Sequence, residues 1–133
     1  MILGIGVDLL SLDRVEKLYL GFSNKFAKKI LSEEELLDFD KLLKNQVAYL
    51  AKKFCAKEAF SKALGTGIGR GVDFCDITIA KNILGKPYVK LSNRASQFIQ
   101  KHYNSDIKKI QVDLSITDEK PYVNCFVIIS SNN

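Results

Sequence analysis

Asp8, Glu58 and Lys62 are the residues of this chain best suited to metal-assisted phosphate chemistry. Asp8 ends a short apolar run, and Glu58 falls on the apolar row of a predicted helix, where the pattern calls for a hydrophobic residue. A carboxylate in such a position is costly unless it is paired or ligates a metal. Mg²⁺ binds through one or two carboxylates with waters and phosphate oxygens, and a nearby lysine can neutralise charge on a transferring phosphoryl group. The three residues therefore indicate Mg²⁺-assisted chemistry on a phosphate ester or a diphosphate.

The same residues also fit simpler arrangements. Residues four apart on a helix form surface ion pairs, so a Glu58–Lys62 pair on an exposed helix end accounts for that spacing. Gly4 and Gly6 share a predicted strand face with Asp8. They leave room for a ligand or another backbone, or they mark only a bulge or a tight sheet contact. The sequence leaves these alternatives open.

Four of the eight glycines fall within residues 65–71, which read GTGIGRG. Such a loop can turn several backbone N–H groups toward one anion, with Arg70 as a counter-charge. The run matches neither of the familiar phosphate patterns, GxxxxGK[ST] and GxGxxG, and it follows a predicted helix instead of leading into one. A phosphate-binding loop and a flexible helix-to-strand connection are both compatible with it.

The elements that must position these residues follow from hydrophobic periodicity, capping residues and turn residues. In chain order they are a strand over residues 2–7, a helical stretch over 12–30 broken near 21–23, a helix capped by Ser32, a helix from Gln46 to Leu64 ended by Gly65, strands over 74–80 and 88–91 joined by a turn at 85–87, a helix over 93–103, and a hairpin of 110–116 and 122–129 across 118–121. Ser32 and Glu35 have capping-box spacing, so the acids at 33–35 are interpreted as structural. Helices followed by paired strands predict an α+β fold, with the N-terminal strand and the helices packed on a mostly antiparallel sheet. We find no linker or repeat, so residues 1–133 are predicted to be a single domain.

Composition narrows the class of protein. The chain has 133 residues and a net charge of +5, which suggests an acidic partner without identifying it. Three separated cysteines and one histidine argue against structural zinc and against a secreted disulfide framework. Asp8 interrupts the N-terminal apolar run before it resembles a signal peptide, and no apolar stretch approaches the length of a membrane span. These features predict a soluble, cytoplasmic protein that does not bind a membrane.

The segment Phe54–Gly67, FCAKEAFSKALGTG, resembles the FxxKEAxxKAxGTG signature of the holo-acyl-carrier-protein synthase family, the small bacterial-type 4′-phosphopantetheinyl transferases. Gly4–Asp8, followed by Arg14, resembles the opening strand and helix of that family. Three further segments fall in the expected order: residues 26–36, 85–87 and 114–118. The resemblance covers nearly the whole chain and implies the α+β, homotrimeric fold of these transferases.

The resemblance implies an activity and catalytic roles. The family transfers the 4′-phosphopantetheine arm of coenzyme A to a serine of apo acyl carrier protein, with Mg²⁺, and releases adenosine 3′,5′-bisphosphate in support of fatty acid biosynthesis. Asp8 and Glu58 match its Mg²⁺ ligands, and Glu58, directly or through a metal-bound water, would take the proton of the incoming serine. Lys62 matches the lysine that contacts the phosphates.

The resemblance also implies binding roles. The residues that match segments lining the coenzyme A site, besides Lys62, are Gly65, Thr66, Gly67, Gly85, Lys86, Pro87 and Asp118. Asp118 stands where many relatives carry a histidine, and an aspartate there also suits a hairpin turn. Arg14 matches a residue that meets the acidic carrier protein, and Lys17, Lys25, Lys28 and Lys29 are expected to add to that face. The family is typically a homotrimer with active sites between protomers, so a neighbouring chain is expected to complete the site.

Two other classes of function remain to be weighed. A nucleic-acid-binding module fits the basic charge, but the chain lacks a basic stripe interleaved with aromatic residues. We therefore expect no nucleic-acid partner. A hydrolase of a nucleotide diphosphate would use the same metal site with water as the nucleophile.

Overall fold

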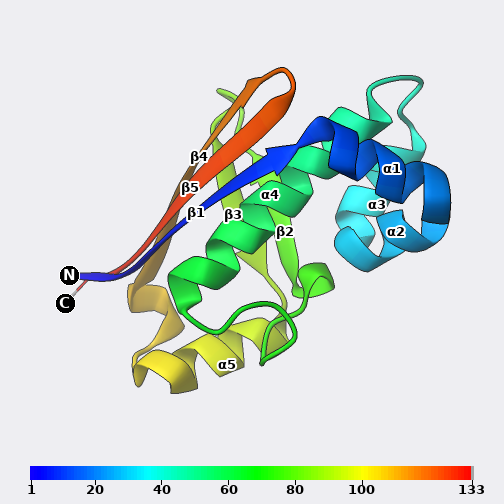
Figure 1. Cartoon of the computed structure of the whole chain (residues 1–133). Helices are drawn as coiled ribbons and strands as arrows, with labels where there is room; N and C mark the ends of the chain where they lie inside the picture. The colour runs from blue at the N-terminus through cyan, green and yellow to red at the C-terminus, as the bar shows by residue number, and fades with distance from the viewer. Residues whose placement is uncertain (133) are drawn as a thin grey trace.

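The computed structural model describes residues 1–132. Its helices and strands, in chain order, are β1 (Ile2–Ser11), α1 (Leu12–Phe22), α2 (Asn24–Ile30), α3 (Glu33–Asp40), α4 (Gln46–Leu64), β2 (Ile77–Lys81), β3 (Pro87–Leu91), α5 (Asn93–Tyr103), β4 (Ile110–Glu119) and β5 (Tyr122–Ser131), with short 3₁₀ turns at Phe74–Asp76 and Ile107–Lys109. Figure 1 shows α4 running across one face of the long strands, with α1, α2 and α3 gathered to one side and α5 beyond the opposite end. The predicted α+β class is confirmed.

The strands form two antiparallel sheets within the described residues. One sheet has the order β1-β5-β4, and the other is the β2-β3 hairpin. Asp8 in β1 pairs with Cys125, and Asp118 in β4 pairs with Val123, so these two acids lie on opposite edge strands. The single sheet of the prediction is therefore divided in two.

The predicted strand over residues 74–80 is wrong in its first half. Residues 74–76 form a 3₁₀ turn, because the side chains of Asp73 and Asp76 bind each other's backbone in a capping box. The strand begins only at Ile77. The alternation of apolar residues was compatible with either conformation, and local side-chain hydrogen bonds decided between them.

The helices match the predictions more closely. The helical stretch breaks at Ser23, whose φ of 46° is left-handed, so α1 and α2 are separate. The capping box of Ser32 and Glu35 is present, and α4 spans the predicted residues and ends at Gly65 in the left-handed region. The middle of α4 is buried on nearly every side, including Lys57 and Ser61, so the helix is a central element of the core instead of an amphipathic surface helix.

Gly4 and Gly6 allow β1 to approach the backbone of α4. A Cβ atom added to Gly4 would lie 1.9 Å from the carbonyl oxygen of Ala63, and one added to Gly6 would lie 2.0 Å from that of Ala59. The sequence left open whether a ligand, another backbone or a bulge explains these glycines. The backbone of α4 occupies the space beside them, and the strand register also shifts between Ile2 and Gly4. The approach brings Asp8, farther along β1, next to α4.

Candidate functional site

Asp8 and Lys62 meet where β1 crosses α4. The Lys62 Nζ lies 3.1 Å from Asp8 Oδ1 and donates a second hydrogen bond to the Val7 carbonyl oxygen at 3.0 Å. Asp8 is largely buried, with a side chain 16% exposed, whereas that of Lys62 is 54% exposed. The ammonium group of Lys62 is therefore fixed by β1 and still open to a ligand.

Glu58 lies one turn earlier on α4, and its carboxylate has no hydrogen-bond or ion-pair partner within residues 1–132. The i,i+4 pair with Lys62 that the spacing left open is not formed, because Lys62 pairs with Asp8. Burial and the neighbouring charge of Asp8 raise the pKa of Glu58, against opposing effects of Lys62 and Arg14. A partly buried, partner-free carboxylate beside a second carboxylate can bind a cation or accept a proton.

The backbone under Asp8 is held by two residues that the sequence did not single out. Its carbonyl oxygen accepts hydrogen bonds from the Cys55 thiol at 3.3 Å and from Asn124 Nδ2 at 3.0 Å. Cys55 comes from α4 and Asn124 from β5, so both neighbours of β1 fix the strand at the position of the acid. No local pattern pointed to either residue, since the contacts join positions 47 and 116 residues apart.

The donor set of this site fits Mg²⁺. In the described part of the chain no group of three His, Cys, Asp or Glu side chains could hold a metal by itself. Mg²⁺ requires less than that, because it commonly uses one or two carboxylates and fills its other positions with waters and substrate phosphates. Asp8 and Glu58 supply such a pair, and the pKa of Glu58 responds to the charge of Asp8.

The loop of residues 65–71 follows directly after Lys62 and the end of α4. All four of its glycines have positive φ, and an added Cβ at Gly65, Gly67 or Gly69 would meet nothing within 4 Å. The loop surface is therefore open, and the path of its backbone depends on glycine. Thr66 bonds within the loop, its hydroxyl donating to the Gly67 carbonyl oxygen at 3.1 Å.

The remaining predicted coenzyme A residues lie at the other side of the chain. Pro87 and Asp118 line a groove of about 730 Å³ with Lys52 and other residues of α3, α4 and β2. The Lys52 Nζ lies 3.5 Å from Asp118, and Lys86, beside Gly85 in the β2–β3 turn, approaches β4. The structure thus brings Asp8, Glu58, Lys62 and the loop of residues 65–71 together. It places the second set of predicted coenzyme A residues, 85–87 and Asp118, away from them, toward the β4 edge.

Arg14 is exposed on α1, on the side of Glu58, where its charge opposes the rise of the Glu58 pKa. A mostly apolar cavity of about 430 Å³ lies next to Glu58 between α1, α2 and α4. Lys25 and Lys29 contribute to its wall. Lys17 and Lys28 are exposed on the same two helices.

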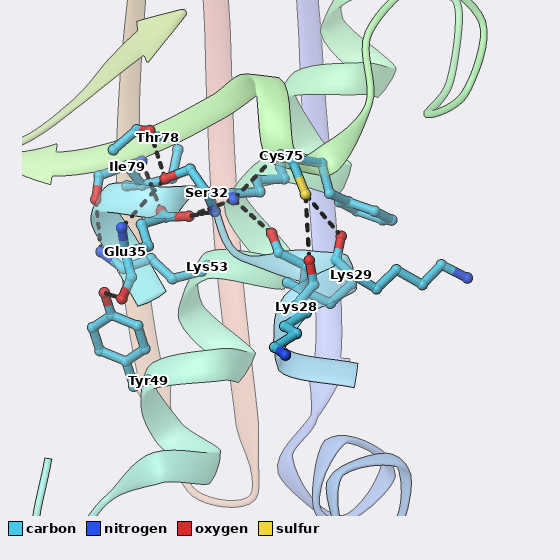
Figure 2. Close-up of polar contacts among 12 residues, drawn as sticks. Lys28, Lys29, Ser32, Glu35, Tyr49, Lys53, Cys75, Thr78 and Ile79 are labelled. Atoms are coloured by element: carbon cyan, nitrogen blue, oxygen red, sulfur yellow. Dashed lines mark hydrogen bonds and ion pairs between the residues drawn. The ribbon is translucent and has the colours of Figure 1, made fainter. Parts of the chain in front are cut away.

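A buried ion pair between Lys57 and Glu35, which was not predicted, lies next to Glu58 in α4. The Lys57 Nζ lies 2.5 Å from Glu35 Oε1 and also donates to the carbonyl oxygens of Ile30 at 2.6 Å and Phe74 at 3.1 Å. Burial lowers the pKa of Lys57, and the charge of Glu35 opposes that effect. Figure 2 shows Glu35 within a larger set of polar contacts that includes Ser32, Thr78 and the Ile79 backbone, which donates to Glu35 at 2.9 Å. Glu33–Glu35 are structural as predicted, and Glu35 also fixes α4 by pairing with Lys57, the residue next to Glu58.

Two carboxylates and a lysine beside an open glycine loop, on an α+β framework, are a set of groups suited to phosphate chemistry. The model of the 4′-phosphopantetheinyl transferase superfamily matches residues 4–121. The holo-[acyl-carrier-protein] synthase of Vibrio parahaemolyticus is 45% identical over 130 residues, 98% of each chain. The crystal structure of that enzyme from Neisseria meningitidis is 43% identical, with a TM-score of 0.89 over 98% of this chain and 100% of that one.

A further solved relative carries a ligand. The Helicobacter pylori holo-[acyl-carrier-protein] synthase, in complex with coenzyme A, is 31% identical, with a TM-score of 0.77 over 95% of this chain and 99% of that chain. With these matches, the chain belongs to the 4′-phosphopantetheinyl transferase superfamily, and it is an enzyme of that class. Among residues 1–132, no helix has the length and apolar character needed to cross a membrane.

Proposed function

We propose that this enzyme transfers the 4′-phosphopantetheine arm of coenzyme A to a serine hydroxyl of apo acyl carrier protein and releases adenosine 3′,5′-bisphosphate. The observation that carries the proposal is the arrangement of Glu58, which has no polar partner among residues 1–132, beside the Asp8–Lys62 ion pair. The names of the relatives support the choice of reaction, and the coenzyme A complex of the H. pylori relative supports the choice of donor.

Asp8 and Glu58 would hold Mg²⁺, which when bound neutralises charge on the diphosphate of coenzyme A. Glu58 accepts the proton of the serine hydroxyl at a carboxylate oxygen as the serine oxygen attacks the β-phosphorus. Lys62, held by Asp8 and the Val7 carbonyl, neutralises the charge that the leaving bisphosphate gains when the bridging P–O bond breaks. The nucleophile comes from the carrier protein, so the chain needs none of its own.

The two sets of coenzyme A residues are proposed to meet between protomers. One set lies near the end of α4 and consists of Lys62, Gly65, Thr66 and Gly67. The other set lies toward the β4 edge and consists of Gly85, Lys86, Pro87 and Asp118. A neighbouring copy that presents its second set to the first would complete the site, and we propose a homotrimer on the pattern of the family.

An uncovered sheet face supports this assembly. Ile5, Val7 and Leu9 of β1 are between 50% and 63% exposed on the face opposite α4, and Phe126 of β5 pairs with Val7. Burying such a stripe against a second copy would be favourable. A chromatographic mass measurement tests the trimer, and a monomer at assay concentration would contradict it.

The carrier protein is proposed to dock on α1 and α2. Arg14 lies on the side of Glu58, Lys25 and Lys29 line the cavity next to it, and their positive charge suits an acidic partner. We further propose that residues 1–133 act as one phosphopantetheinyl transferase domain, that the activity serves fatty acid biosynthesis, and that the enzyme works in the cytoplasm.

The test is intact-mass analysis of apo acyl carrier protein incubated with the enzyme, coenzyme A and Mg²⁺. The carrier is expected to gain the mass of one phosphopantetheine. Glu58→Gln and Asp8→Asn should each abolish the gain and keep the far-ultraviolet circular dichroism of the parent. Asp40→Asn, which alters an exposed carboxylate on α3, serves as the control and should transfer normally. Loss of coenzyme A without a gain on the carrier would instead reveal a hydrolase and overturn the proposal.

A further inference from the structure

Helix α5 touches both ends of the glycine loop. At the start, His102 Nε2 lies 3.1 Å from the carbonyl oxygen of Leu64, the last residue of α4. At the end, the Phe98 ring lies against Gly71, where an added Cβ would come within 2.2 Å of the ring carbon Cε2. The rings of Phe98 and His102 stack with their centroids 5.6 Å apart. One stacked pair of rings thus joins the two ends of the loop.

The chemistry of the His102 contact is defined by its acceptor. A carbonyl oxygen only accepts, so Nε2 carries the proton and donates, in the neutral and in the charged ring alike. Leu64 lies in the last turn of α4, where carbonyl groups lack partners within the helix, and it is only 3% exposed. His102 therefore satisfies a backbone acceptor at the point where the chain leaves the helix.

The loop between these anchors has few contacts of its own. Gly65 and Gly67 donate to the Ser61 carbonyl oxygen at 3.1 and 3.3 Å, and Gly69 donates to that of Val72 at 3.0 Å. The open space around Gly65, Gly67 and Gly69 means that no side chain packs over the loop at those positions. Between its ends, Ile68 packs against the hydrophobic core, and the rest of the loop conformation depends on how its two ends are held.

We propose that His102, stacked on Phe98, is a positioning residue for coenzyme A binding. By holding the Leu64 carbonyl, it fixes the exit of α4, so that the backbone of residues 65–67 follows one path beside Lys62, where the phosphates would bind. The inference rests on the proposed function, which assigns residues 65–67 to coenzyme A. His102 does not touch the reacting atoms, and its effect is on the affinity for the donor substrate.

Two substitutions at His102 distinguish the effect of its hydrogen bond to Leu64 from the effect of its aromatic ring. His102→Phe keeps an aromatic ring to stack on Phe98 but leaves the Leu64 carbonyl without its donor. His102→Gln keeps an amide N–H near the same place. Loss of one ordinary hydrogen bond predicts that KM and Kd for coenzyme A rise about 2- to 10-fold in His102→Phe. The rate constant kcat should stay near that of the parent, because the lost interaction is made equally before and during the reaction.

The matched control is Lys101→Gln, which removes the neighbouring cation of the last turn of α5 without affecting the Leu64 contact. It should leave both constants unchanged, and His102→Gln should lie closer to the parent than His102→Phe. Calorimetry gives Kd without turnover, and thermal melting verifies that the variants fold. Unchanged Kd and KM in His102→Phe, or equal losses in His102→Gln, would overturn the inference. An unmodified enzyme that transfers nothing to the carrier would instead refute the proposed function.

Discussion

Gly6→Ala perturbs the contact that brings Asp8 to α4. The new methyl carbon would lie 2.0 Å from the Ala59 carbonyl oxygen and 2.6 Å from the Ala63 backbone nitrogen, where 3.0 Å is the practical lower limit. Both obstacles are helix backbone, so they cannot rotate aside as a side chain does. Strand β1 must therefore move away from α4 by roughly 1 Å at this point, and Asp8 lies only two residues farther along the strand.

The expected effects are on stability and on rate. Forcing a methyl group into a packed contact costs roughly 1–3 kcal/mol in the free energy of unfolding. Displacing a catalytic group by about 1 Å lowers the rate by roughly 100-fold. The Asp8–Lys62 ion pair and the approach of Asp8 to Glu58 both depend on this strand position, so we expect activity to fall further than stability alone explains.

Gly21→Ala is the matched control, because the added methyl group would meet nothing within 4 Å and Gly21 lies in α1. Removing a helical glycine should raise stability by roughly 0.5–1 kcal/mol and leave transfer unchanged. Urea unfolding and the carrier-modification rate are measured for both variants under conditions where each is folded. A Gly6→Ala enzyme with the parental unfolding midpoint and rate would refute the view that this glycine sets the position of Asp8.

Three further predictions concern other parts of the molecule. Arg14→Glu reverses a docking charge and should weaken binding of apo acyl carrier protein on the order of tenfold. Calorimetry should show an unchanged affinity for coenzyme A, and equal losses for both ligands would count against the docking face. Lys57→Met should lower the free energy of unfolding by about 3–5 kcal/mol, because it leaves Glu35 buried without its cation. In urea titrations, the double variant of Lys57→Met with Glu35→Gln should recover part of that loss. Burial raises the pKa of Asp76, but hydrogen bonds and the ion pair with Arg94 outweigh it and hold the pKa below the ordinary 3.8. Asp76→Asn should therefore be less stable than the parent above pH 3.8, and the difference should vanish as the pH falls through the lowered pKa; a constant difference across acid titration would contradict it.

Local patterns predicted the elements whose causes are local. The ends of α4 follow from apolar spacing and Gly65, and the start of α3 follows from two capping residues three positions apart. Glu58 was found because an acid interrupts an apolar row, and the structure gives it a half-buried place beside Asp8.

Contacts between distant residues could not be predicted in this way. Lys57 binds acceptors 17, 22 and 27 residues away, which no periodicity records. In β1 the larger residues Ile5, Val7 and Leu9 lie on the exposed face, since the face toward α4 accommodates only glycine at positions 4 and 6. An alternating pattern shows that a strand has two faces, and the neighbouring helix determines which face is covered.

The Lys57–Glu35 pair has a consequence for how this sequence can change over time. All three protons of the Lys57 ammonium have acceptors, and both oxygens of Glu35 are in use, so neither residue can be replaced alone without leaving a buried group unsatisfied. Divergence at either position therefore passes through a less stable intermediate sequence. Descendants that lose the acid at position 35 are expected to have lost the lysine at position 57 as well, as a linked substitution.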